Sequence, residues 1–89
     1  MDLEIPHSLG AVAAQARVAQ VTPGIEKDFG AECRWDDASR LRVTRKGLQA
    51  TLSILEDRVR VSVELGLFLR PMGPSIRNGI AKRLAEVLA

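Results

Sequence analysis

The sequence predicts an α+β domain in which a mostly antiparallel sheet carries both helical segments on one face. Residues 31–65 alternate polar and apolar side chains, and the segments on either side repeat apolar residues at helical spacing. The composition, 46% hydrophobic and 27% charged, is ordinary for a globular protein. At 89 residues the chain has the length of one domain. We therefore expect a single domain over residues 1–89, with the element order β-αα-ββββ-α.

The first predicted element is a short strand over residues 2–5. Leu3 and Ile5 alternate with acidic residues, so both fall on one face of an extended chain. Pro6 follows and ends the strand, because proline lacks the N–H that a sheet ladder uses.

A helix that is interrupted near its C-terminal third is predicted over residues 8–29. Apolar and small residues recur at helical spacing, with the small ones on the buried side. Ser8 is a suitable N-cap, and Gly30 is well placed as the C-terminal stop. Thr22 and Pro23 interrupt the pattern, so we expect a kinked or broken helix whose second piece begins at Pro23.

Four alternating runs between residues 31 and 65 predict an antiparallel meander. Short polar turns separate the runs at residues 36–39, 46–47 and 56–57. The apolar side chains point to one face, and arginines dominate the other face. We expect the apolar face to form the core and the arginine-rich face to be solvated.

A final helix is predicted after Pro74. Its apolar stripe consists of Ile76, Ile80, Leu84, Val87 and Leu88. Gly79 is a poor helix former, and we interpret it as a mark of close packing of this helix against the sheet. In element order, the predicted fold is similar to a shortened helix-grip fold, in which a curved sheet wraps a long C-terminal helix and often binds apolar ligands.

The chain offers few residues for a catalytic or metal site. His7 is the only histidine and follows a proline, where a loop or capping role is expected. Cys33 is the only cysteine, is predicted to share the apolar face with Trp35, and cannot form an internal disulfide. One histidine and one cysteine cannot close a zinc site, and no glycine-rich phosphate loop follows a strand. We expect no catalytic residues, metal or cofactor, and we predict that the protein is not an enzyme.

The net charge of +2 hides an asymmetry between the two halves of the chain. Residues 1–39 hold seven acids and three bases, whereas residues 40–89 hold four acids and ten bases. The solvated sheet face is predicted to carry Arg34, Arg42, Arg58 and Arg60. These arginines could contact nucleic-acid phosphates, but single strands are usually bound by stacking on aromatic side chains, and this face has none. Nucleic acid is therefore the less favoured partner, and simple solvation of the arginines is preferred.

The segment between the last strand and the last helix, residues 64–74, is the main candidate surface. Two glycines and two prolines break it, and its apolar side chains follow no regular period. The candidate contact residues are Leu67, Phe68, Leu69, Arg70 and Met72. Four apolar side chains rarely all point inward from an irregular segment, so we expect one or two to stay exposed. A patch of this kind beside Arg70 would suit a hydrophobic surface or a homodimer contact.

The N-terminus and the hydropathy pattern bear on location. The first residues are acidic and lack the apolar run behind a basic start that marks a signal peptide. No run approaches the ~18 apolar residues of a membrane-spanning helix. We therefore expect a cytoplasmic protein without a transmembrane segment.

Three features of the sequence resemble the polyhydroxyalkanoic acid system family. They are residues 5–10 (Ile-Pro-His-Ser-Leu-Gly), Trp35 at the end of its strand, and residues 64–71 (Glu-Leu-Gly-Leu-Phe-Leu-Arg-Pro) before an amphipathic helix. The resemblance covers nearly the whole chain, and its motifs are structural rather than catalytic. It implies a small cytoplasmic bacterial protein linked to polyester storage granules as a surface or regulatory component. The interruption at residues 22–24 departs from the more continuous, charged helix expected in that family.

The residues and the resemblance favour one function and leave two alternatives. The favoured hypothesis is a non-enzymatic accessory or regulatory protein of polyhydroxyalkanoate metabolism, which binds a granule surface or a granule-associated protein through the apolar residues at 67–72. One alternative is a nucleic-acid-binding regulator that uses the arginine-rich face. The other is a small carrier of apolar ligands, which requires a cavity between the sheet and the C-terminal helix.

Overall fold

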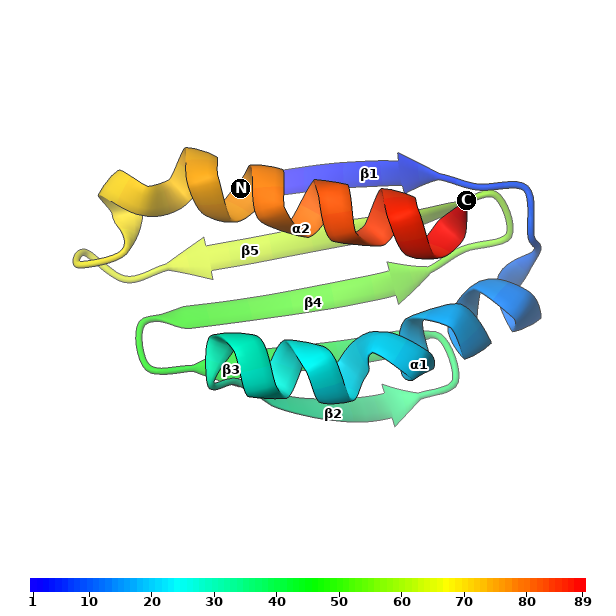
Figure 1. Ribbon diagram of the computed structural model, residues 1–89, viewed down its shortest axis with the longest axis horizontal. Helices are drawn as coiled ribbons and strands as arrows, with labels where there is room; N and C mark the ends of the chain where they lie inside the picture. The colour runs from blue at the N-terminus through cyan, green and yellow to red at the C-terminus, as the bar shows by residue number, and fades with distance from the viewer.

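The computed structural model describes residues 1–89, which form a five-stranded antiparallel sheet with two helices on one face (Figure 1). The strands are β1 (Asp2–Pro6), β2 (Glu32–Asp37), β3 (Arg40–Arg45), β4 (Leu48–Ile54) and β5 (Arg58–Leu65). The helices are α1 (Ala11–Phe29) and α2 (Gly73–Leu88), and a short 3₁₀ helix, η1 (Arg70–Met72), precedes α2. This arrangement confirms the predicted α+β fold.

The order of the strands across the sheet is β1-β5-β4-β3-β2, and all neighbours are antiparallel. The strands from β2 to β5 form the predicted meander, in which a short turn joins each strand to the next. β1 pairs with β5, so the first strand of the chain lies beside the last. α1 carries the chain from β1 at one edge of the sheet to β2 at the other edge (Figure 1).

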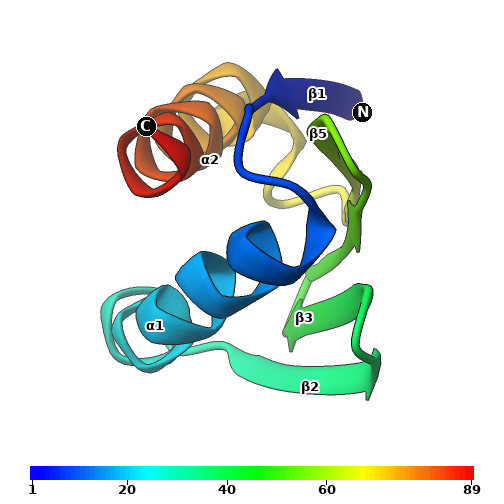
Figure 2. The same ribbon diagram turned by 90° about the vertical axis from the view of Figure 1, so that its right-hand side faces the viewer.

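The core lies between the sheet and the two helices, on the face that the alternating pattern predicts (Figure 2). The sheet contributes fully buried side chains such as Leu41 and Val61, and the helices contribute Val18 and Leu84. Burying one such side chain is worth roughly 1.5–3 kcal/mol relative to leaving it exposed. No polar or charged residue is buried, so apolar burial alone fills the core.

α1 is one helix, so of the kinked or broken helix that the sequence predicts, the break at Pro23 is wrong. Pro23 lacks the N–H that would donate to the carbonyl of Ala19, four residues earlier. The hydroxyl of Thr22 donates to that carbonyl instead, with an Oγ1–O distance of 2.9 Å. This substitute hydrogen bond explains how the helix continues through a proline.

The start of α1 also differs from the prediction, because the helix begins at Ala11 and Ser8 is not its N-cap. Gly10 occupies the N-cap position with a φ of 81°, a left-handed conformation that favours glycine. The backbone N–H of Ala11 donates to the carboxylate of Glu56, in the turn between β4 and β5, over 3.4 Å. A carboxylate suits the partial positive charge of a helix N-terminus, so a distant residue supplies the role assigned to Ser8.

Gly79 in α2 does not mark close packing, which corrects a further prediction. A Cβ atom added at this position would meet no atom within 4 Å. The helix therefore keeps a poor helix former beside open space rather than against the sheet.

Cys33 in β2 is half-buried and packs against the core, as predicted for a small apolar residue. Its Sγ lies 4.0 Å from the carbonyl oxygen of Thr22 in α1. Burial raises the pKa of the Cys33 thiol, and the carboxylate of Glu26 adds to the rise. The thiol therefore stays protonated at neutral pH, and a protonated thiol is a poor nucleophile.

Replacing Thr22 with valine should destabilise the protein by about 1 kcal/mol, because the carbonyl of Ala19 loses its donor while the side-chain shape is kept. Thermal unfolding should show a melting temperature lowered by about 4–8 °C. Thr22→Ser keeps the hydroxyl and is the matched control. A Thr22→Val protein as stable as the wild type would contradict the role given to this hydrogen bond.

The raised pKa of Cys33 should appear in the pH profile of its reaction with a thiol reagent. The midpoint of that profile should lie higher in the native protein than in urea, because burial and Glu26 disfavour the thiolate. The folded state should correspondingly lose stability as the pH rises through the range in which an unfolded thiol ionises. Glu26→Gln should move the native midpoint downward. An unchanged midpoint in Glu26→Gln would show that this carboxylate does not act on the thiol.

Candidate functional site

The chain between β5 and α2, residues 66–72, forms a corner at one end of the sheet (Figure 1). We call these residues the corner segment. The N–H of Gly66 donates to the carbonyl of Gly47, in the turn between β3 and β4, over 2.7 Å. Gly47 has a φ of 83°, a conformation that other residues adopt only with strain. The corner segment is therefore tied to a neighbouring hairpin as well as to its own strand.

A tight turn within the corner segment exposes its first two apolar side chains. The carbonyl of Gly66 accepts hydrogen bonds from the N–H groups of Leu69 and Arg70, at 3.0 and 3.1 Å. Leu67 and Phe68 occupy the two central positions of this turn, where side chains project away from the chain ends. The exposed fractions of these residues are 76% for Leu67 and 97% for Phe68. We call Leu67 and Phe68 the turn tip.

The other two apolar residues of the corner segment lie closer to the protein. Leu69 is half-buried and packs over Gly47, where an added Cβ atom would come within 3.3 Å of its Cδ1. Met72 is 53% exposed. Three of the four apolar side chains are thus exposed, where the sequence predicted one or two. Arg70 is also exposed, and its Nε lies 3.5 Å from the carbonyl oxygen of Leu65.

An apolar cavity of about 320 Å³ lies behind the corner segment, between the sheet and both helices. Its floor comes from β3 and β4, one wall from the last turns of α1, and the other wall from α2. Leu69 and Met72 line it from the corner segment, and the polar residues in its lining are Arg45, Ser75 and Arg83. We call this space the inter-helix cavity. From sequence, such a cavity could be stated only as the requirement of an alternative function. Gly79 also lines the cavity, although its place in a helix is interpreted from sequence as a mark of close packing.

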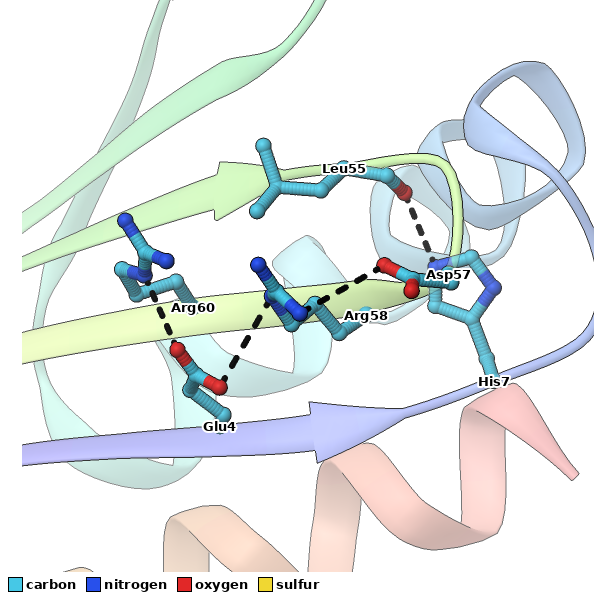
Figure 3. Close-up of polar contacts among 6 residues, drawn as sticks. All are labelled: Glu4, His7, Leu55, Asp57, Arg58 and Arg60. Atoms are coloured by element: carbon cyan, nitrogen blue, oxygen red, sulfur yellow. Dashed lines mark hydrogen bonds and ion pairs between the residues drawn. The ribbon is translucent and has the colours of Figure 1, made fainter.

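Two arginines of the predicted basic face share one carboxylate (Figure 3). Glu4 of β1 lies beside β5, with its Oε1 3.1 Å from Nε of Arg60 and its Oε2 3.7 Å from Nε of Arg58. Arg58 also faces Asp57, with an Nη1–Oδ1 distance of 3.9 Å. Two acids therefore offset two bases at this edge of the sheet.

The other two arginines of the predicted basic face lie near the opposite edge of the sheet. Arg42 contacts Asp36 at 2.9 Å, and Arg34 contacts Glu32 at 3.7 Å. β4, which has no charged residue, runs between these arginines and those of β5. The structure thus divides the predicted basic face into two patches, each offset by acids. Exposed pairs of this kind add little stability, but they weaken the positive field that a phosphate backbone would meet.

His7 holds the loop between β1 and α1 against the turn between β4 and β5 (Figure 3). Its Nε2 lies 3.1 Å from the carbonyl oxygen of Leu55, and its Nδ1 accepts the N–H of Leu9 over 3.2 Å. These contacts correspond to the neutral tautomer with the proton on Nε2. The backbone N–H of His7 also donates to the carbonyl of Asp57. Main-chain groups thus occupy both ring nitrogens, which gives His7 the loop role that the sequence predicts.

No group of three histidine, cysteine, aspartate or glutamate side chains is placed to hold a metal ion. No helix has the length and the apolar character that a membrane crossing requires.

Comparison with known proteins identifies a family. A search of the curated proteins finds no match, and a search of the solved structures finds none. The likeness in element order to a helix-grip fold stays a prediction. A family model described as a polyhydroxyalkanoic acid system protein matches residues 1–88. Because this match spans all but the last residue, the chain belongs to the polyhydroxyalkanoic acid system family, as the resemblance of residues 5–10 and 64–71 indicates.

Proposed function

We propose that this protein is a non-enzymatic accessory component of polyhydroxyalkanoate metabolism, which contacts the storage granule in the cytoplasm through its turn tip. Membership of the family supports the link to polyhydroxyalkanoate. The observation that carries the contact is the 97% exposure of Phe68, next to an equally apolar Leu67. Exposed Met72 and Arg70 border the turn tip and form the edge of the contact.

The physical basis of the contact is the removal of apolar side chains from water. Burying Leu67 and Phe68 on a polyester surface is worth roughly 1.5–3 kcal/mol for each side chain. The turn that presents them is already fixed by the hydrogen bonds that Leu69 and Arg70 donate to the carbonyl of Gly66, so little further ordering of the main chain is needed. A rigid apolar tip is therefore suited to a surface that has no fixed shape of its own.

The arginine-rich sheet face supports a nucleic-acid partner less well. Each of its four predicted arginines lies within ion-pair distance of a carboxylate of the same protein. A phosphate backbone would have to displace or compete with those carboxylates. We therefore propose the granule surface, or a granule-associated protein, as the partner.

The double variant Leu67→Ser/Phe68→Asp should fail to co-sediment with isolated polyhydroxyalkanoate granules. Losing the burial of these two side chains on the granule removes about 3–6 kcal/mol, which lowers the affinity by two orders of magnitude or more. The far-ultraviolet circular dichroism and the melting temperature should stay close to those of the wild type, because both side chains are exposed.

Val12→Asp is the matched control for this experiment. Val12 is 86% exposed and lies in the first turn of α1, near the turn between β4 and β5. The corner segment lies at the other end of the strands, beside the turn between β3 and β4. Val12→Asp should therefore sediment like the wild type. Normal sedimentation of the folded double variant would show that the turn tip is not the contact.

A further inference from the structure

We propose that the inter-helix cavity binds a single acyl chain that ends in a carboxylate. This site is separate from the turn tip and does not depend on contact with a granule. Three observations carry the proposal: the size and lining of the cavity, the position of Gly79, and the charges at its rim.

The cavity has the size and the lining that one alkyl chain requires. Its volume is about 320 Å³, and twelve of its sixteen lining residues are hydrophobic. At about 30 Å³ for a group of the size of a water molecule, it holds roughly ten such groups, and a methylene is of similar size. This volume fits a chain of about eight to ten carbons.

Gly79 keeps the cavity open at a cost to the helix. It lies in the interior of α2, where glycine is the least favourable residue apart from proline. An added Cβ atom would meet nothing within 4 Å, so no neighbour prevents a larger side chain there. The apolar side chains that line the cavity have no protein atoms to pack against on its open side. An alkyl chain in the cavity would supply those packing contacts.

The rim of the cavity carries a guanidinium that no carboxylate of the protein neutralises. Arg45 at the end of β3 donates to the carbonyl of Phe29 over 3.0 Å, and it takes part in none of the ion pairs. Arg83 pairs with Asp28 at 3.1 Å and stacks over the ring of Phe29, with 5.0 Å from Cζ to the ring centroid. Arg45 is thus the free cation of the rim, and an anionic head group complements it while the tail enters the cavity.

The experiment uses the full-length protein and ligands with one ten-carbon chain. Isothermal titration is carried out with decanoate, with 3-hydroxydecanoate and with decan-1-ol, each below the concentration at which it aggregates. Decanoate represents a fatty acid, 3-hydroxydecanoate represents a hydroxyacid monomer of a polyester, and decan-1-ol has no charged head. Both acids should bind, and decan-1-ol should bind about tenfold more weakly than decanoate, because it lacks the charge-assisted contact with Arg45. The tighter of the two acids identifies the source of the ligand, and either order agrees with the proposal.

Two substitutions locate the site. Gly79→Leu should abolish binding of all three ligands, because Gly79 lines the cavity and no neighbouring atom keeps a larger side chain out of it. Gly79→Leu should also raise the melting temperature. Gly79→Ala, which adds a single carbon, should raise the melting temperature too, with a smaller loss of affinity for the ligands. Arg45→Gln should weaken decanoate about tenfold and leave decan-1-ol unchanged. Arg34→Gln, on the opposite face of the sheet, is the matched control and should bind like the wild type.

Several results would overturn the proposal. One is that neither decanoate nor 3-hydroxydecanoate binds at millimolar concentration. Another is undiminished binding to a folded Gly79→Leu or Gly79→Ala protein. A third is an equal loss of affinity for decanoate in Arg45→Gln and Arg34→Gln. The Leu67→Ser/Phe68→Asp variant should keep its affinity for decanoate, and Gly79→Leu should keep its sedimentation with granules. The two proposals can therefore fail independently.

Discussion

The contact between the main chains of Gly47 and Gly66 fixes the position of both candidate surfaces. The two residues share a hydrogen bond of 2.7 Å, and a Cβ atom on Gly66 would lie 3.3 Å from Cα of Gly47. A side chain at Gly66 would press on backbone, which cannot move aside as a flexible side chain can. The corner segment and the turn between β3 and β4 would have to separate by a few tenths of an ångström. The turn tip and one wall of the inter-helix cavity thus depend on a close approach that glycine permits.

The corner segment presents apolar side chains in two directions because a tight turn reverses the chain within it. Leu67 and Phe68 lie at the centre of the turn and face solvent, whereas Leu69 and Met72 follow the turn and line the cavity. The corner segment, which in the sequence is one apolar run, therefore places side chains both in solvent and in the cavity lining. The turn tip and the cavity-lining residues Leu69 and Met72 are neighbours along the chain, yet a substitution at the turn tip leaves the cavity lining in place.

The features that the sequence predicts well are those determined by local periodicity. Alternation placed Leu41 and Val61 on the buried face, and helical spacing placed Leu84 in the core. The features that it missed depend on residues that the fold brings together from afar. Glu56 caps α1, and Glu4 pairs with Arg60, only because the register of β1 with β5 and the position of the turn between β4 and β5 place them there. The cavity could be named only as the requirement of one alternative function, because a hydrophobic pattern does not record how closely the side chains pack.

The position of the turn tip bears on the kind of partner that it suits. The molecule measures 36 × 21 × 18 Å, and the corner segment lies at one end of its long axis (Figure 1). An end-on contact through two side chains covers far less than the roughly 800 Å² per partner of a typical stable protein–protein interface. A polymer surface offers many equivalent places and requires no matched shape, so a small rigid tip can engage it wherever the protein arrives. Many copies bound side by side would then cover the surface, and the affinity of each copy need not be high. We therefore propose the polyester itself, rather than a granule-associated protein, as the partner of the turn tip.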